Sequence, residues 1–282
     1  MTKEFFTLNN GVKIPSLGYG TWQIPAGQIA VDAAKDAIIA GYRHIDCAAI
    51  YENERSIARG IKEGLAQTNL KREDIFITSK LWNSNRGYEN ALKAFEKTCD
   101  DLGVDYLDLY LIHFPANDKQ FKNAKEINEQ TWQAFVELYE KGRIKAIGVS
   151  NFLIHHLEQL KDAKVRPMVN QVEFHPGWAQ TELIKYCKEN DILVEAWGPL
   201  GCGHLIHEER LQKIGAKYGA SAAQVCIAWC LAKGTLPLPK SVHKEWILEN
   251  SKLIKLENDD IEAISVMDNL FYSGMNPDEV GF

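Results

Sequence analysis

Two residues near the start of the chain have side chains suited to acid–base chemistry. Asp46 ends a short apolar run typical of a buried strand, and Tyr51 follows five residues later. A buried carboxylate is costly unless a cation pairs with it. A tyrosine hydroxyl has an ordinary pKa of about 10, so it is a useful proton donor near pH 7 only if a cation lowers that value. The pair therefore predicts that the rest of the chain supplies a cation and a second polar group, and that it binds a cofactor.

Strand-like and helix-like stretches alternate along the rest of the chain. Short apolar runs with strand character cover residues 17–20, 43–46, 75–80, 106–113, 144–150, 168–173, 193–197 and 236–239. Helix periodicity covers residues 29–40, 54–64, 88–102, 127–140, 155–161, 181–189 and 221–233, and two further helices fit residues 244–252 and 259–267. Such alternation implies parallel strands that are joined by right-handed crossovers.

Eight such units in about 250 residues match the size of a (β/α)8 barrel. The alternative, a doubly wound sheet, would have a G-x-G-x-x-G after its first strand, and Gly18-Tyr19-Gly20 does not continue that way. We therefore predict an α/β fold of the TIM barrel type, as a single domain over residues 1–282. We expect an N-terminal β-hairpin over residues 5–15 and extra helices near the C-terminus.

Polar residues at the C-terminal ends of barrel strands meet at one mouth. Asp46, Lys80 and His113 end three successive predicted strands, with Tyr51 nearby. Taken alone, His113 is better interpreted as a core histidine, and a single ion pair could simply close a barrel end. Ionisable groups at the same end of three successive strands favour an active site instead.

Composition and charge exclude several other classes of protein. A net charge of −6 argues against a broad nucleic-acid interface, which needs a basic face. No run approaches the roughly 18 apolar residues of a membrane span, and the N-terminus lacks the apolar segment of a secretory signal. The six cysteines form no C-x-x-C pair, so we expect reduced thiols in a cytoplasmic protein.

The segments that contain these residues resemble the aldo-keto reductase family. They are GYRHIDCAAIYENE, ITSKLW, LYLIHFP, IGVSNF, NQVEFHP, AWGPLG and LPKSV, in the family's order, and the similarity spans residues 6–267. The AWGPLGCG segment is most similar to bacterial members of the 2,5-diketo-D-gluconate reductase type. The resemblance implies a catalytic tetrad of Asp46, Tyr51, Lys80 and His113. It also implies that the protein reduces aldehydes or ketones by hydride transfer from a nicotinamide cofactor, with Tyr51 as the proton donor.

Elementary electrostatics supports these roles. An ammonium about 4 Å from the phenol, at an effective dielectric constant of about 20, is worth roughly 4 kcal/mol. One pKa unit corresponds to about 1.36 kcal/mol, so we expect Lys80 to lower the pKa of Tyr51 by about three units, to near neutrality. Asp46 would keep Lys80 protonated and would offset part of its field. His113, as a neutral imidazole, would hydrogen-bond the substrate carbonyl and orient it.

The resemblance also implies a cofactor site. Ser150, Asn151 and Gln171 would hold the nicotinamide carboxamide, which needs both donors and acceptors, and Trp197 would stack on the ring. The backbone of residues 198–201 would lie along the pyrophosphate. The complete set implied to bind the cofactor is Thr21, Ser150, Asn151, Gln171, Trp197, Gly198, Leu200, Gly201, Lys240, Ser241, Trp246, Glu249 and Asn250.

The chain departs from the family where the 2′-phosphate of NADP(H) would bind. The family has an arginine six residues after the lysine that corresponds to Lys240, and this chain has Trp246. An indole can stack on the adenine but lacks the charged fork of a guanidinium. Lys240 and Ser241 should still favour the phosphate, helped by His243 or Lys244. We therefore expect NADP(H) to be preferred by a reduced margin, with NAD(H) also used.

Aromatic residues follow several of the predicted strands. One such residue is usually part of the core, but four at one barrel mouth favour the wall of a substrate pocket. They are Trp22, Trp82, Phe114 and Trp178. The tail over residues 271–282 is short, so we expect an open pocket with broad specificity.

Two histidine clusters could suggest a metal site, but both lack further ligands. They are His204, His207 and Glu208, in a predicted loop and short helix, and the pair His155 and His156. A solvated face is the better interpretation of each, and we predict no metal.

Two alternatives to a carbonyl reductase remain open. One is a non-catalytic nicotinamide-binding regulatory subunit, like the barrel subunits of potassium channels, although the complete tetrad disfavours it. The other is a double-bond reductase like the steroid 5β-reductases, in which a glutamate replaces the tetrad histidine, and His113 argues against it. We expect a small-molecule carbonyl substrate, no nucleic-acid or membrane partner, and a monomer.

Overall fold

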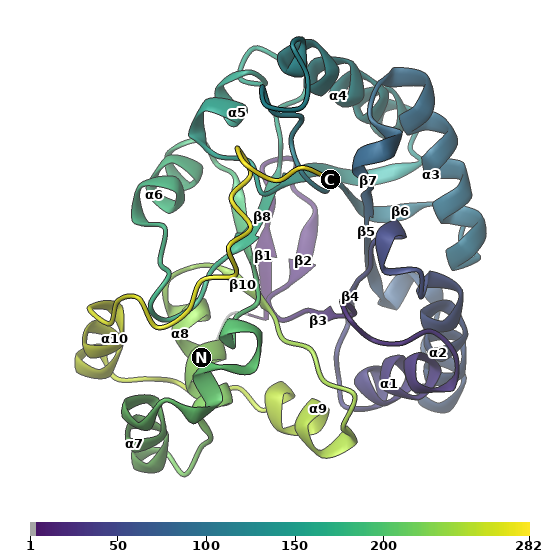
Figure 1. The fold of residues 1–282 in the computed structure, drawn as a ribbon. Helices are drawn as coiled ribbons and strands as arrows, with labels where there is room; N and C mark the ends of the chain where they lie inside the picture. The colour runs from purple at the N-terminus through teal and green to yellow at the C-terminus, as the bar shows by residue number, and fades with distance from the viewer. Residues whose placement is uncertain (1–3) are drawn as a thin grey trace.

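The computed structural model describes residues 4–282 and shows a barrel of parallel strands surrounded by helices (Figure 1). Its strands are β3 (Tyr19–Gly20), β4 (His44–Asp46), β5 (Phe76–Leu81), β6 (Leu107–Ile112), β7 (Ile144–Ser150), β8 (Val169–Glu173), β9 (Leu193–Trp197) and β10 (Leu236–Leu238). Each strand pairs in parallel with the next along the chain. Hydrogen bonds from Gly18 N to Pro237 O (3.1 Å) and from Gly20 N to Pro239 O (3.0 Å) join the two ends. The predicted (β/α)8 barrel is confirmed, and a doubly wound sheet with two open edges is excluded.

Eight helices form the outer ring. They are α1 (Gln28–Ile39), α2 (Glu54–Thr68), α3 (Tyr88–Leu102), α4 (Ala124–Glu140), α5 (Ile154–Glu158), α6 (Thr181–Glu189), α8 (Ala222–Ala232) and α9 (Lys244–Ser251). Because α9 contacts both α8 and α1, it completes the ring. The additional helices are α7 (Glu209–Lys217), inserted before α8, and α10 (Asn258–Ser265). None of the helices within residues 4–282 combines the length and the apolar character that crossing a membrane requires.

Close packing between α1 and α2 fixes the segment that contains Tyr51. Two glycines on α2 make this packing possible, because a Cβ atom at Gly60 would lie 2.3 Å from the carbonyl oxygen of Val31. A Cβ atom at Gly64 would lie 2.9 Å from Cβ of Ile38. Both distances are too short for a side chain, so only glycine permits this approach. The connection from β4 to α2 is therefore held firmly at both ends.

A hairpin closes the end of the barrel that is opposite the strand C-termini. Its strands, β1 (Phe5–Thr7) and β2 (Lys13–Pro15), pair antiparallel as predicted. At the turn, the Asn9 side chain donates to the carbonyl oxygens of Pro167 (3.3 Å) and Asp191 (3.2 Å), just before β8 and β9. The opposite mouth, where the strands end, is crossed by the segment that follows α10 (Figure 1).

Candidate active site

The ammonium group of Lys80 links Asp46 and Tyr51 beneath the barrel mouth. Lys80 Nζ lies 2.6 Å from Asp46 Oδ2, 3.3 Å from the Tyr51 hydroxyl and 3.0 Å from the carbonyl oxygen of Cys47. The Lys80 side chain is 0% exposed and that of Asp46 is 5% exposed. All three hydrogens of the ammonium therefore have oxygen partners, as a buried charge requires. The strand ends bring these residues together as predicted.

The direction expected for the pKa of Tyr51 is wrong. Desolvation by burial raises this pKa to about 12, although the charge of Lys80 lowers it and that of Asp46 raises it. Removing the phenolate from water is thus a larger effect than attraction to the neighbouring ammonium. Tyr51 is consequently protonated throughout the neutral range. That state is the one that a proton donor needs.

His113 lies against Tyr51 and is held as a neutral imidazole. Burial and the nearby charge of Lys80 place its pKa well below the ordinary value. Its ring centroid lies 5.7 Å from that of Tyr51 and 5.2 Å from that of Trp82. Within the described part of the chain, its Nδ1 is buried without a hydrogen-bond partner. Because His113 also lines the cavity above Tyr51, its neutral ring is suited to bind a polar group of a ligand.

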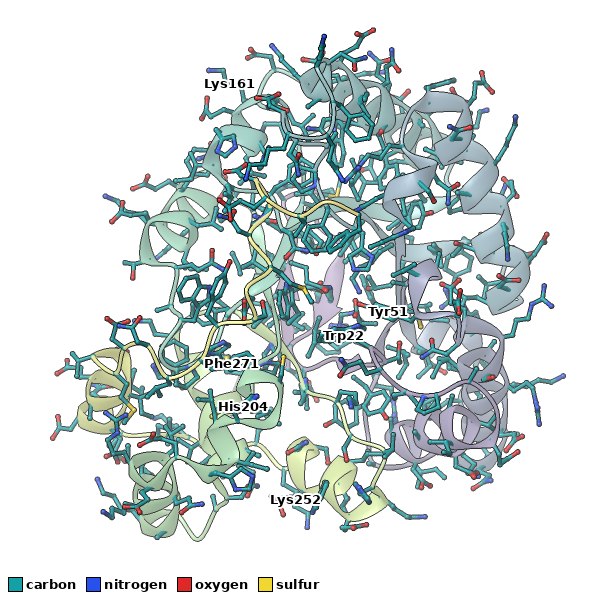
Figure 2. All side chains as sticks on the ribbon, viewed as in Figure 1. Trp22, Tyr51, Lys161, His204, Lys252 and Phe271 are labelled. Atoms are coloured by element: carbon teal, nitrogen blue, oxygen red, sulfur yellow. The ribbon has the colours of Figure 1, made fainter. Side chains whose placement is uncertain are left out.

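A cavity of about 330 Å³ opens above Tyr51. Three of the four predicted pocket aromatics line it, and Trp22 and Tyr51 are seen together at the mouth in Figure 2. The expected residues in its wall are Trp22, Tyr51, Trp82, His113, Phe114, Ser150, Asn151, Gln171 and Trp197. The residues that were not expected are Gln23, Ile50, Met275 and Phe282. The fourth aromatic, Trp178, lies in an adjacent cavity and stacks on Tyr272 at 4.2 Å between ring centroids.

The C-terminal segment supplies part of the wall of this cavity, which the sequence did not predict. Phe282 stacks on Trp82 with centroids 5.4 Å apart and meets the ring of Phe114 edge-on at 5.2 Å. The Asn83 side chain donates to the Phe282 carbonyl oxygen at 3.0 Å. These contacts join residues about 200 positions apart in sequence, which no local pattern could predict.

The same segment is held by polar contacts along its length, some buried and some exposed. Ser273 donates from its hydroxyl to Glu173 Oε2 (2.7 Å) and from its backbone to Glu173 Oε1 (3.0 Å). Asp278 lies 3.0 Å from His155 Nε2 and 3.3 Å from His156 Nε2. Among the described residues, His155, His156 and Asp278 form the one group of side chains close enough together to be metal ligands. Because Leu153 N donates to His156 Nδ1 at 3.2 Å, the proton of a neutral His156 is on Nε2. The group is thus a hydrogen-bonded clamp on the segment.

In the second histidine cluster, His204 makes an aromatic contact with the C-terminal segment. His204 stacks on Phe271, with ring centroids 4.6 Å apart and an interplanar angle of 18°. Figure 2 shows the two residues next to one another, where the loop after β9 meets the C-terminal segment. His204 is exposed, and this stack is a packing contact between the loop after β9 and the C-terminal segment.

The residues predicted to hold the nicotinamide carboxamide are already held in place by hydrogen bonds to one another. The Ser150 hydroxyl donates to the carbonyl oxygen of Gln171 (2.8 Å), and Asn151 Nδ2 donates to Ser150 Oγ (3.1 Å). Trp197 Nε1 donates to Asn151 Oδ1 at 2.9 Å. The backbone φ of Asn151 is 61°, a left-handed conformation that asparagine tolerates better than most residues. A preorganised polar wall of this kind loses little freedom when a ligand binds.

A second cavity of about 430 Å³ lies between the loop after β9 and the segment after β10. The predicted cofactor residues in its wall are Leu200, Lys240, Ser241, Trp246, Glu249 and Asn250. The Trp246 side chain is 51% exposed, and its ring lies 4.2 Å from that of His243. Lys244 was expected to help bind the phosphate, but it does not line this cavity. Its ammonium pairs with Asp36 on α1 at 3.2 Å.

The segment between the two cavities fits an extended dinucleotide. Trp197 lines the first cavity and Leu200 lines the second. Gly198 and Gly201 have φ values of 61° and 54°, and a Cβ atom at Gly198 would meet only Cys202 Sγ, at 3.8 Å. There is therefore open space beside the backbone at Gly198, whereas Gly201 is buried against Leu205. Thr21 is 0% exposed and donates its hydroxyl to Asp46 O at 2.8 Å, so its side chain lines neither cavity.

Sequence reasoning missed a buried carboxyl group below the first cavity. Glu195 lies in the middle of β9 and is 0% exposed. Its Oε2 accepts a hydrogen bond from Gln171 Nε2 at 2.8 Å, and Gln171 Nε2 also donates to Asp46 Oδ1 at 2.9 Å. The sequence did contain a signal for this group. Glu195 interrupts an apolar strand, and both faces of the strands in an all-parallel barrel are buried, so its side chain had to be buried.

Comparison with known proteins assigns the chain to a family. The aldo/keto reductase family model matches residues 16–269. A glyoxal reductase of Bacillus subtilis is 46% identical over 283 residues, covering 99% of this chain and 98% of that protein. A solved aldo/keto reductase from Brucella melitensis has a TM-score of 0.86 and 43% identity, covering 94% of this chain and 99% of that one. An aldo-keto reductase from Bombyx mori in complex with NADP has a TM-score of 0.87 and 30% identity, covering 96% and 95%. The barrel fold and these matches show that the chain belongs to the aldo/keto reductase family of oxidoreductases.

Proposed function

We propose that this protein reduces the carbonyl group of aldehydes or ketones to an alcohol with NADPH. The observation that carries the proposal is the contact of the buried Lys80 ammonium with both Asp46 and the Tyr51 hydroxyl. That hydroxyl belongs to a cavity that His113 and five aromatic side chains also line. NADPH, when bound, supplies a hydride to the carbonyl carbon. The chain itself must then bind the carbonyl oxygen and deliver a proton to it.

Tyr51 is the proposed proton donor, and Lys80 makes the donation possible. As hydride reaches the carbonyl carbon, negative charge develops on the oxygen, which becomes a stronger base than a phenolate. Tyr51 holds its proton until that point, since its pKa is raised to about 12. Lys80, 3.3 Å from the hydroxyl, then stabilises the phenolate that remains. Neutral His113 binds and orients the carbonyl oxygen beside Tyr51.

The nicotinamide end of the cofactor is assigned to the first cavity and the adenosine end to the second. Ser150, Asn151 and Gln171 present amide and hydroxyl groups toward the first, which suits a carboxamide. The exposed ammonium of Lys240 and the Ser241 hydroxyl line the second, which suits the 2′-phosphate of NADPH. The Bombyx mori relative, solved with NADP, supports this choice. NADH is used as well, less efficiently.

The glyoxal reductase relative makes small dicarbonyl compounds the first substrates to test. Loss of NADPH absorbance should be followed with glyoxal, methylglyoxal, aromatic aldehydes and keto-sugars. Replacement of Tyr51 by phenylalanine removes the proton but little volume, so the variant should still bind NADPH. Its kcat should fall by about 10²- to 10⁴-fold, the usual contribution of general acid catalysis. A phenylalanine variant that kept more than about a tenth of kcat would show that another group is the acid.

The same assay distinguishes the enzyme from a nicotinamide-binding regulatory subunit. A subunit that only senses the cofactor would bind NADPH without oxidising it, whatever carbonyl compound was present. No observation on this chain favours that alternative. The state of the cysteines supports a cytoplasmic enzyme, since all six are free thiols and five of them are buried.

A further inference from the structure

Glu195 is a buried acidic group to which the proposed reaction assigns no role. It lies inside the barrel, in register with Gln171 on the strand before it and Leu236 on the strand after it. Trp197, two residues further along β9, lines the first cavity. Because side chains two apart in a strand point to the same face, Glu195 is one layer below that cavity. A carboxyl group in such a place needs a compensating interaction.

The compensating interaction is with the side-chain amide of Gln171. This amide nitrogen has two hydrogens, and both are used. One is donated to Asp46 Oδ1 at 2.9 Å and the other to Glu195 Oε2 at 2.8 Å. Asp46 is the ion-pair partner of Lys80, so it bears a negative charge and accepts only. The polar atom that Gln171 has left is its amide oxygen, and Gln171 lines the first cavity.

Glu195 itself is a neutral carboxylic acid near pH 7. Burial and the charge of Asp46 raise its pKa to about 8, while the bond from Gln171 and the charge of Lys80 oppose that shift. On β4, His44 Nε2 lies 3.9 Å from Glu195 Oε1. Burial and Lys80 lower the pKa of His44 to about 3, so His44 is neutral too. A second negative charge beside Asp46 is thereby avoided, and Glu195 still offers an acceptor oxygen.

We propose that Glu195 is a positioning residue that, together with Asp46, holds the Gln171 amide with its oxygen toward the cofactor. Held between two carboxyl groups, Gln171 can present only its oxygen, which accepts a hydrogen bond from the amino hydrogens of the nicotinamide carboxamide. Without Glu195 the amide nitrogen keeps only Asp46 as its partner. Because the terminal torsion of a glutamine is broad, the amide then tilts, and its oxygen is no longer fixed toward the carboxamide. This inference rests on the proposed function, because it places the nicotinamide beside Gln171.

The test compares two variants of the full chain in NADP+ binding, measured by quenching of tryptophan fluorescence. Glu195→Gln is nearly isosteric with a neutral carboxyl group and retains an acceptor oxygen, so its affinity should stay close to that of the unmodified protein. Glu195→Leu has no acceptor and should bind NADP+ about 5- to 150-fold more weakly, as expected when a buried polar group loses its partner. Glu195→Met fills the same space with a more adaptable side chain and repeats the measurement if the leucine variant does not fold.

A cofactor analogue separates positioning from a structural effect. The 3-acetylpyridine analogue of NADP+ has a methyl group in place of the carboxamide nitrogen, so it offers Gln171 no donor. The affinity lost in Glu195→Leu should therefore largely vanish with the analogue. Equal losses for NADP+ and the analogue, or no loss for either, would overturn the role of Glu195. Failure of the unmodified protein to bind NADP+ at all would overturn the proposed function, and this inference with it.

Discussion

The cavity above Tyr51 is lined by side chains that buried neighbours already hold, whereas the cavity beside Lys240 includes the exposed side chains of Lys240, Val242, His243 and Trp246. At the first, Gln171 bonds two groups inside the barrel, and Tyr51 contacts the Lys80 ammonium, which is buried beneath the cavity. In the second, Lys240 and Trp246 are exposed at the surface. The first is made of strand ends and the second of a loop and a helix.

This difference indicates where the protein depends on fixed geometry and where it tolerates change. A proton donor must be in place before the reaction, and a charge inside the barrel is worth far more than one in water. Selection of a phosphate needs only a nearby positive charge, and its contribution is reduced by solvent and salt. We therefore expect substitutions in the first cavity to have larger effects on activity and stability than substitutions in the second.

The largest effect is expected from Lys80→Met, which retains an apolar stem and deletes the charge. Asp46 would be left buried without its cation, and activity should be almost completely lost. The free energy of unfolding should fall by about 3–5 kcal/mol, the usual cost of an uncompensated buried charge. Chemical denaturation monitored by circular dichroism measures this change.

A matched control for this stability measurement is Lys244→Met near the second cavity. It breaks an ion pair with Asp36 in which the lysine side chain is 70% exposed. Exposed pairs contribute about 0–1 kcal/mol, so the control should be nearly as stable as the parent. Equal losses of unfolding free energy in the two variants would show that the two cavities do not differ in their dependence on fixed charges.

An intermediate effect is expected from Trp246→Arg, which restores a charged fork at the second cavity. One charge-assisted hydrogen bond is worth roughly 1.5–3 kcal/mol, or about 10- to 150-fold in discrimination. The ratio of kcat/KM for NADPH to that for NADH should rise by that order. Lys240→Gly should bring the ratio close to one. Parity between the cofactors in the unmodified protein would show that Lys240 does not contact the phosphate.

The smallest effect is expected from Phe282→Ala, which removes the ring over Trp82 and Phe114. An aromatic pair adds about 0.5–1.5 kcal/mol, so kcat/KM for aromatic aldehydes should fall by about 2- to 12-fold. Small dicarbonyl substrates, which are too short to reach this ring, should be affected less. An equal fall for both classes would indicate that Phe282 supports the fold of the mouth and does not contact substrate.

The sequence predicted the barrel and the meeting of Asp46, Lys80 and His113, because each of these interrupts or ends an apolar run. It did not predict the direction of the pKa of Tyr51, since desolvation depends on how completely neighbouring elements cover a hydroxyl. It also missed Glu195, whose role depends on a partner from another strand. The position of Phe282 depends on contacts between distant parts of the chain, and no periodic pattern reports such contacts.

The polar clamps on the C-terminal segment have a consequence for the timing of the catalytic cycle. Ser273 and Asp278 attach this segment through side-chain hydrogen bonds, whereas each barrel strand is paired along its backbone on both sides. Regions held in this way open in local fluctuations that cost less than global unfolding. We therefore expect the segment to open as a separate cooperative unit, so that its opening rate limits product release while the barrel stays intact.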